Sequence, residues 1–390
     1  MSARRVLLYV QHLLGIGHLR RAAALAHGLA AAGLDATLVS GGEPVATVAD
    51  GARAAGIRWV QLPPASAADL GFQTLLDEHG REVDDRWRES RAAALLDAWR
   101  GARPHVLLLE LYPFGRRQMR FELLPLLEAA AADACRPFIA TSLRDILGGG
   151  RSEARRRETL DLLERYFDAV LVHSDRAVVP LESTFPEAGE VAAKLHYTGY
   201  VVGAAPRGAV AGAGEVLVSA GGGAVGGRLL ETAIRARSRS RLRDRTWRIL
   251  AGVHLDDAAF AALQDLAREC GAGIVLERAR ADFGVLLANC EVSVSQAGYN
   301  TLLESVQARA RTVAVPFAGG QETEQSLRAR RFAERGLLEV LEESRLTPEA
   351  LAATVDRAAA RPRPAEGALD LGGAARSAEL VAQWAESRQW

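Results

Sequence analysis

Several residues able to do acid–base chemistry stand where a predicted strand ends. Gly15-Ile16-Gly17-His18 follows the apolar run Val6–Val10 and precedes the helix-like segment Arg20–Ala32. Glycines allow a tight turn there, and the start of a helix offers unpaired N–H groups. A histidine has an unperturbed pKa of about 6.5 and can act as a general base near neutrality. We interpret His18 as the candidate base, with a helix-capping or structural histidine as the alternative.

Two carboxylates follow other predicted strands of the same half. Glu110 opens the segment ELYPFGRR after the strand Val106–Leu109, and Asp145 closes the segment SLRD after Phe138–Thr141. Ligands of open α/β sheets bind beyond the carboxyl ends of the strands, so both segments are expected to face the ligand. Glu110 or Asp145 is expected to orient His18 or to serve as the base itself. At least one of them is expected to pair with nearby arginines instead.

A second constellation lies in the C-terminal half, in the segment SQAGYNT at residues 295–301. It begins with Ser295 at the end of a strand, turns through Gly298 and enters a helix around Asn300 and Thr301. Such a helix start can bind a diphosphate through its free N–H groups and its dipole, the latter worth about 0.3–1 kcal/mol. Glu304 lies one turn further on the same side, where a carboxylate can accept both hydroxyls of a ribose. The alternative is an ordinary capping box formed by Asn300 or Thr301 with Glu304.

Two glycine-containing loops complete the candidate site residues. The segment SAGGG at 219–223 follows the first strand of the second half, and its Gly222 and Gly223 allow the backbone to approach a ligand closely. The loop that starts at Pro316 carries Gln321, Glu324 and Gln325, whose amide and carboxylate groups suit hydrogen bonds to sugar hydroxyls. Flexible turns and a solvated loop are the respective alternatives.

The elements that position these residues alternate along the chain. Short apolar runs are separated by longer amphipathic segments, which predicts parallel sheets covered by helices on both faces. Strands are predicted at 6–10, 36–39, 57–62, 106–110, 138–141, 169–172, 216–219, 248–250, 274–276, 292–294 and 312–315. Helices are predicted at 20–32, 155–166, 257–269, 301–308, 324–335 and 374–384.

The alternation occurs twice, on either side of a seam. Residues 198–214 read TGYVVGAAPRGAVAGAG, and this small, nearly uncharged, Gly/Pro-punctuated stretch predicts a linker and not a packed element. We therefore predict one domain at 1–200 and another at 201–390, with the terminal helix at 374–384 able to pack back on the first.

Composition excludes several classes of protein. The chain has 390 residues of which 49% are hydrophobic, which fits two or three folded domains. Lys+Arg and Asp+Glu both number 48, so no global field would attract nucleic acid. Three widely spaced cysteines form no disulfide framework and no zinc pattern, and no apolar stretch approaches the ~20 residues that span a bilayer. A cytoplasmic protein is expected.

Taken together, the motifs resemble a known family. The pattern combines Gly15-x-Gly17-His18, a Thr198-Gly199 hinge, Ser295-x-Ala297-Gly298 with Glu304, and Pro316 with Glu324-Gln325. It is similar to the GT-B glycosyltransferases of family-28 type, the type that includes the peptidoglycan N-acetylglucosaminyltransferase of lipid II synthesis. The resemblance covers most of the chain in order and is most specific over residues 291–336, whereas residues 65–165 show no match.

The resemblance implies two Rossmann-like parallel-sheet domains that face each other across a cleft. The N-terminal domain would bind the acceptor beside Gly15, Gly17 and His18, and the C-terminal domain would bind a nucleotide sugar. The turn at 298–301 would hold the diphosphate and Glu304 the ribose, while Glu324 and Gln325 would contact the donor sugar. Two departures stand out: Arg328 occupies a position where the family usually has asparagine, and Gly222-Gly223-Ala224 lacks a common serine.

The resulting expectation is a metal-independent, inverting transfer of a hexosyl or N-acetylhexosaminyl group from a UDP-sugar, without a cofactor. No Asp-x-Asp motif occurs to hold a metal–diphosphate complex. The acceptor is expected to be a small molecule, a lipid-linked molecule or a glycan, with peripheral membrane contact in the lipid case. The alternatives are a nucleotide-sugar epimerase or hydrolase of the same fold, or a non-catalytic nucleotide-sugar-binding protein. A dehydrogenase is disfavoured, because the full dinucleotide fingerprint is lacking.

Overall fold

The computed structural model describes residues 4–68, 74–149, 152–205, 210–220, 226–252, 255–317, 319 and 323–388. The chain folds into two compact α/β units. One is built from residues 4–147, 152–203 and 370–388, and the other centres on residues 204–369. None of the described helices is both long enough and apolar enough to cross a membrane.

The first unit contains a parallel sheet whose strands are short apolar runs buried on both faces. Its described strands run in the order β3-β2-β1-β6-β7-β8-β9. They are β1 (Arg5–Val10), β2 (Asp35–Ser40), β3 (Arg58–Gln61), β6 (Val106–Glu110), β7 (Phe138–Arg144), β8 (Ala169–His173) and β9 (Leu195–Tyr197), beside a small ribbon of β4 (Ser66–Ala67) and β5 (Leu75–Leu76).

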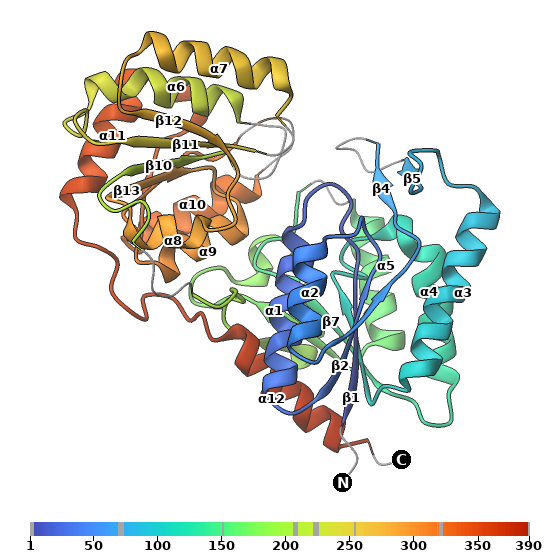
Figure 1. Cartoon of the computed structure of the whole chain (residues 1–390). Helices are drawn as coiled ribbons and strands as arrows, with labels where there is room; N and C mark the ends of the chain where they lie inside the picture. Colours follow the sequence, from blue (N-terminus) through green and yellow to red (C-terminus); the bar gives the residue numbers. More distant parts are fainter. Residues whose placement is uncertain are drawn as a thin grey trace. The chain divides into compact units, whose positions relative to one another are not determined.

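Helices cover both faces of this sheet. They are α1 (Gly17–Ala31), α2 (Ala46–Ala54), α3 (Asp85–Ala102), α4 (Arg120–Ala132), α5 (Glu153–Tyr166) and α12 (Gly373–Glu386). Because side chains alternate along a strand, Val106 and Leu108 of β6 pack in one cluster with α1 and α12, while Leu107 and Leu109 pack in another with α3 and α4. Figure 1 shows α12 lying beside α1, although their first residues, Gly17 and Gly373, are 356 positions apart in the sequence.

The second unit repeats this design. Its described strands run in the order β12-β11-β10-β13-β14-β15, again all parallel. They are β10 (Val216–Ser219), β11 (Trp247–Ala251), β12 (Ile274–Arg278), β13 (Val292–Ser295), β14 (Thr312–Ala314) and β15 (Glu339–Val340). The helices are α6 (Gly227–Ala236), α7 (Asp257–Glu269), α8 (Phe283–Asn289), α9 (Tyr299–Gln307), α10 (Glu324–Glu334) and α11 (Pro348–Ala360). Short 3-10 helices lie at Arg117–Met119, Leu181–Ser183, Pro186–Lys194, Arg237–Arg239 and Glu343–Arg345.

The start of the predicted linker is packed, so that prediction is wrong for residues 198–201. Tyr200 is fully buried, and its N–H donates to Asp370 O at 2.7 Å while its own carbonyl accepts from Gly373 N at 3.0 Å. A Cβ on Gly199 would lie 2.5 Å from the Asp370 carboxyl carbon, so only glycine fits. The residues that lead into α12, Asp370 to Gly373, therefore pack against Gly199 and Tyr200. Residues 201–203 and 370–388 belong to the first unit as a result.

The strand order reverses once in each sheet, which creates a crevice for ligands at that point. In the first unit the reversal lies between β1 and β6, and in the second unit between β10 and β13. The two parallel-sheet α/β units predicted from the sequence are thus confirmed, and each has one switch point at the carboxyl edge of its sheet.

Candidate active site

The first switch point brings His18 and Glu110 together. Helix α1 begins at Gly17 after an N-cap, Ile16, that offers no side-chain hydrogen bond, and His18 lies in its first turn. Glu110 is the last residue of β6. His18 Nδ1 lies 2.8 Å from Glu110 Oε1, and the two side chains are 17% and 0% exposed. Gly15 is exposed and Gly17 half-buried in the loop before the helix.

Burial and neighbouring charges fix the protonation of this pair. The pKa of His18 is lowered to about 3. Burial is the largest cause, Glu110 raises the pKa, and the charge of Arg116 lowers it. Burial alone would raise the pKa of Glu110, but His18, Arg21 and Arg116 bring it down to about 2. Glu110 is therefore ionised at neutral pH and can only accept, so the proton of the neutral imidazole is on Nδ1. His18 Nε2 keeps a lone pair that can take up a proton.

Asp145 occupies a different position at the same edge. It directly follows β7, is fully buried, and its Oδ1 accepts a hydrogen bond from Ile146 N at 2.8 Å. The structure thus pairs His18 with Glu110 and gives Asp145 a bond within its own loop. Glu110 also pairs with Arg21, which lies one turn after His18 on α1.

A buried polar network, which the sequence did not reveal, supports the loop after β1. Arg91 of α3 is fully buried, and its Nε donates to Glu122 Oε2 at 2.7 Å while its Nη2 donates to Gln11 Oε1 at 2.5 Å. Tyr9 donates from its hydroxyl to Glu122 Oε1 at 2.5 Å. The polar pair Tyr9 and Gln11 at the end of an apolar strand was the one sequence feature that could have indicated this network. Arg91 gave no such indication, because arginines usually lie at the surface.

The same network explains the glycines at the end of β2. A Cβ on Gly41 would lie 2.2 Å from Gln11 Oε1, and one on Gly42 would lie 2.5 Å from the His12 ring. Arg91 Nη1 donates to Gly41 O at 2.8 Å. Close packing therefore requires glycine at both positions.

The second switch point carries the turn from Ser295 into α9. Gly298 is the N-cap of α9 and no side chain caps the helix, so the capping-box alternative is wrong: Asn300 and Thr301 lie inside the helix. Both are half-buried, as is Glu304. Ser295 pairs in register with Ser219 of β10. Both hydroxyls are buried and have no hydrogen-bond partner among the described residues, which leaves polar atoms unsatisfied at this point.

Arg328 of α10 connects the predicted donor residues. It is fully buried, and its Nη2 donates to Glu324 Oε1 at 2.8 Å while its Nη1 donates to Ala297 O at 3.2 Å. Its guanidinium lies 5.2 Å from the centroid of the Tyr299 ring. Gln325 Oε1 accepts from Phe317 N at 3.0 Å. The arginine that departs from the family pattern thus joins the start of α10 to the turn before α9.

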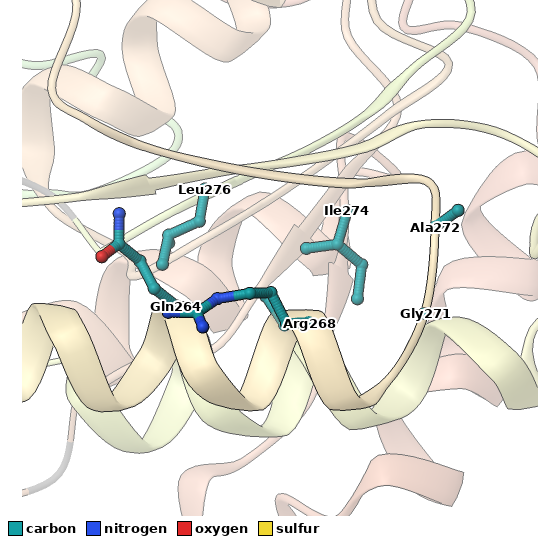
Figure 2. A pocket seen from close by; sticks show the side chains of 7 residues that line it. Gln264, Arg268, Gly271, Ala272, Ile274 and Leu276 are labelled. Carbon is teal, nitrogen blue, oxygen red and sulfur yellow. The ribbon is translucent and has the colours of Figure 1, made fainter.

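Three of the predicted donor residues cannot be placed. Gly222, Gly223 and Gln321 lie outside the described residues. A hollow of about 510 Å³ is lined by Gln264, Ala267, Arg268, Gly271, Ala272, Ile274 and Leu276. Figure 2 shows it between α7 and the edge strand β12, where Gln264 and Arg268 project from the helix. This hollow lies toward the start of β12, whereas ligands of parallel sheets bind at the carboxyl ends of the strands. We therefore place the candidate active site at the switch points and not in this hollow.

The C-terminal part of the chain, which contains the second switch point, matches a known protein family. Residues 281–378 match the model of the glycosyltransferase family 28 C-terminal domain. This part of the chain is similar to the C-terminal domain of family 28 glycosyltransferases. It includes the turn at Gly298, Glu304 and the Glu324-Gln325 start of α10, whereas the His18–Glu110 pair lies outside it.

Solved structures share the fold over nearly the whole chain. The calicheamicin glycosyltransferase CalG4 aligns with a TM-score of 0.62 and 19% identity, covering 98% of both chains. MurG of Acinetobacter baumannii aligns with a TM-score of 0.57 and 14% identity, covering 97% of this chain and 99% of the other. The spinosyn rhamnosyltransferase SpnG, complexed with thymidine diphosphate, aligns with a TM-score of 0.56 and 16% identity, covering 98% and 96%. No curated protein matches the sequence.

The predicted fold and enzyme class are therefore confirmed. The likeness to CalG4 and MurG establishes the GT-B fold, and the family 28 domain supports glycosyl transfer as the activity. These comparisons support a glycosyltransferase of GT-B fold whose residues 281–378 are similar to family 28.

Proposed function

We propose that this glycosyltransferase moves a hexosyl or N-acetylhexosaminyl group from a nucleotide sugar to an acceptor hydroxyl, with inversion and with His18 as the base. The observation that carries the proposal is the neutral His18 held by the ionised Glu110 at a switch point. A neutral imidazole with a fixed Nδ1–H is a base whose free nitrogen is Nε2.

The chemical step follows from that arrangement. His18 Nε2 takes the proton of the acceptor hydroxyl as its oxygen bonds to the anomeric carbon. The bond from that carbon to the diphosphate breaks at the same time, and attack opposite the leaving group inverts the configuration. Glu110 then stabilises the imidazolium through the Nδ1–H hydrogen bond and keeps the ring oriented.

The donor would be held by the second switch point. The uncapped start of α9 supplies N–H groups and the positive end of a helix dipole for the diphosphate. Such groups offset leaving-group charge without a metal, in line with the lack of an Asp-x-Asp motif. Glu304 would accept the ribose hydroxyls, and Glu324 with Gln325 would contact the sugar. UDP is proposed by the family resemblance, and the thymidine diphosphate complex of SpnG supports the same class of ligand.

A thermal-shift panel with UDP, dTDP, GDP, CDP and NAD in EDTA tests the donor class. A ligand at 100 times its Kd stabilises the fold by about 2.7 kcal/mol, so one nucleoside diphosphate should raise the Tm selectively. Glu304→Gln should weaken that ligand about 10-fold, since one carboxylate–hydroxyl contact is lost. Glu334→Gln is the matched control, because Glu334 is an exposed α10 residue paired with Arg331. A shift with NAD alone would contradict the proposal.

The acceptor would be a small molecule, a lipid-linked molecule or a glycan, the lipid case bringing peripheral membrane contact. Mass spectrometry of reactions with nucleotide sugars should reveal a new glycoside when the correct acceptor is present. Turnover of the sugar nucleotide with no acceptor added, and no glycoside formed, would instead favour a hydrolase or an epimerase.

A further inference from the structure

Three polar side chains gather where the neighbouring strands β1, β2 and β3 end. Ser40 is the last residue of β2 and pairs in register with Gln61, the last residue of β3. His12 lies in the loop after β1, the strand that pairs with β2. Ser40 and His12 are 0% and 4% exposed, and Gln61 is half-buried. The proposed chemical step uses none of these residues.

His12 and Gln61 both contact the turn that follows β2. Gln61 Nε2 donates to Gly42 O at 2.8 Å and to Ser40 O at 3.1 Å. A Cβ on Gly42 would lie 2.5 Å from His12 Nδ1, so the imidazole packs directly on this glycine. His12 Nε2 lies 3.1 Å from the carbonyl oxygen of Glu43, an exposed residue. These contacts bring the imidazole and the amide to one glycine, two residues after Ser40 and close to the surface.

One polar atom of each side chain has no hydrogen-bond partner among the described residues. These atoms are His12 Nδ1, Ser40 Oγ and Gln61 Oε1, and each is buried. A buried polar atom without a partner costs about 1–3 kcal/mol, and most such atoms in proteins are paired. Three of them at the carboxyl edge of one sheet indicate a place where ligand atoms complete the hydrogen bonds.

The hydrogen bonds already made fix the roles of these three atoms. The Gln61 nitrogen donates to three main-chain carbonyls, so it cannot be exchanged with the oxygen, and Oε1 is the acceptor that remains. His12 Nε2 carries the ring proton, because the Glu43 carbonyl can only accept. Burial lowers the pKa of His12 to about 4, so the ring is neutral and Nδ1 keeps a lone pair. The three side chains thus offer two acceptors and one hydroxyl.

This set of atoms matches a hydroxyl group. A hydroxyl of a ligand can donate to His12 Nδ1 or Gln61 Oε1 and can accept from Ser40 Oγ. A carboxylate or a phosphate ester has only acceptor oxygens at neutral pH, so these would face the lone pairs of His12 and Gln61. The three side chains therefore favour a neutral, hydroxyl-bearing ligand over an anionic one.

The three side chains lie at the same edge of the sheet as the His18–Glu110 pair. Ser40 and Glu110 each follow, by two residues, a leucine that packs in the cluster with α1, so both project from that face. The register places Val10 of β1 between them, and at about 4.8 Å per strand they stand about 10 Å apart. Two hydroxyls of one glycan or glycoside can occupy both positions.

We propose that His12, Ser40 and Gln61 form a subsite that binds a hydroxyl of the acceptor, and that the acceptor carries a neutral sugar. This inference rests on the proposed function for the term acceptor and for the role of His18. The subsite holds one sugar hydroxyl while another lies at His18 Nε2, and it discriminates against acceptors with an anionic group at this position.

Saturation-transfer NMR of the full chain with the methyl glycosides of glucose, galactose, mannose and N-acetylglucosamine tests the subsite. Wild type should bind at least one of them, and should bind the methyl glycoside of glucuronic acid more weakly. Ser40→Ala and His12→Phe should each weaken the bound glycoside about 3- to 10-fold, the worth of one hydrogen bond. Ser293→Ala should bind like wild type, because it removes another buried, unpartnered hydroxyl, from β13 of the second unit.

Three results would overturn the subsite. They are no binding of any neutral glycoside by wild type, equal affinity in wild type, Ser40→Ala and His12→Phe, and a preference for the glucuronide. Thermal unfolding of Ser40→Ala without ligand adds a readout that a structural role would move. Loss of an unpartnered hydroxyl should leave the Tm unchanged or raise it, whereas a lower Tm would show that the hydroxyl serves the fold and would also overturn the subsite.

The donor measurement keeps this inference separate from the proposed function. Ser40→Ala should retain the full Tm shift with the nucleoside diphosphate that stabilises wild type. A nucleoside diphosphate shift in a wild-type chain that binds no glycoside would overturn the subsite and leave the proposed donor in place. Glycoside binding that depends on Ser40, without any nucleoside diphosphate shift, would defeat the proposed donor while supporting a sugar subsite.

Discussion

The protonation of His18 is set by its surroundings more than by its own chemistry. Burial disfavours the imidazolium, and Arg116 adds to this, while Glu110 favours it. The net effect places the pKa of His18 at about 3, so the imidazole is a neutral base over the whole physiological range. In the proposed mechanism, ionised Glu110 would orient the ring and stabilise the imidazolium that forms only during the reaction.

Replacing His18 by glutamine should lower the rate of transfer by about 10²–10⁴-fold, the usual worth of a positioned general base. The measurement is release of nucleoside diphosphate in the presence of the acceptor. His27→Gln is the matched control, because His27 is an exposed residue of the same helix. A wild-type rate in His18→Gln would remove the assignment of His18 as base.

The same reasoning predicts the pH profile of kcat/KM. Because the pKa of His18 is about 3, protonation of this residue should cause no loss of rate between pH 8 and pH 5. A histidine with the ordinary pKa of about 6.5 would lose about 10-fold by pH 5.5. A rate that falls with an apparent pKa near 6.5 while the protein stays folded would contradict the buried, neutral base.

The sequence located the two residues of this pair but not what supports them. Glu110 was predictable because it ends an apolar strand, and His18 because it begins the helix that follows another such strand. The ends of parallel strands share one edge of the sheet. Arg91 and Glu122 were not, because a helix reading DRWRESRAAALLDAWRGA has the composition of a solvated surface helix. Only the tertiary structure shows that Arg91 is fully buried and bonded to three separate segments.

At the scale of elements, the buried side chain of Arg328 joins α10 to the turn before α9. Arg328 links Glu324, in the first turn of α10, to the Ala297 carbonyl just before α9. The strands were predicted well because runs such as VLVS and VSVS are apolar and bounded by turns. The alternative of Asn300 as a helix cap is wrong because Gly298, two residues earlier, provides the extended backbone that starts the helix.

Removing Arg328 should strongly destabilise the second unit. Arg328→Met removes one partner of the buried Arg328–Glu324 ion pair, which costs about 3–5 kcal/mol. Arg328→Met combined with Glu324→Gln should recover part of that loss, since no uncompensated charge remains. Urea unfolding followed by the fluorescence of Trp247, which is fully buried in this unit, measures both variants.

The control is an ion pair on the same helix in a different environment. Arg331 pairs with Glu334 at 3.2 Å, but the two side chains are 40% and 61% exposed. Arg331→Met should therefore change the free energy of unfolding by no more than about 0.5 kcal/mol. Strict additivity of the Arg328 and Glu324 substitutions would show that the two side chains are not coupled.

On the scale of the whole molecule, the two units should respond differently to acid. Seven of the eight histidines precede residue 204, and the other, His254, lies outside the described residues. In the first unit, burial is the largest cause that lowers the pKa of five of them. The effect is largest for three, with a pKa of about 4 for His12 and about 3 for His18 and His173. Each is thus neutral in the folded chain at a pH where it would be charged when unfolded.

The sign of the effect follows from proton binding. Below the unfolded pKa of about 6.5 the unfolded chain binds more protons than the folded chain, so the free energy of unfolding falls as the pH falls. One pH unit corresponds to about 1.4 kcal/mol per group, so each histidine should cost about 1 kcal/mol at pH 5.5. Glu110 adds to this loss of stability only below about pH 4.5. There the carboxyl group of the unfolded chain takes up a proton, whereas the folded-state pKa of about 2 keeps Glu110 ionised.

Hydrogen exchange measured by mass spectrometry at pH 7.0 and 5.5, corrected for intrinsic rates, should show this asymmetry. Amides of β6, β7 and β8 should lose protection at pH 5.5, whereas those of β10, β13 and β14 should change less, because the described part of the second unit contains no histidine. His173→Gln cannot charge, so its loss of protection between the two pH values should be smaller than in wild type. Equal loss in both units, or an unchanged acid sensitivity in His173→Gln, would mean that the buried histidines do not control the acid stability.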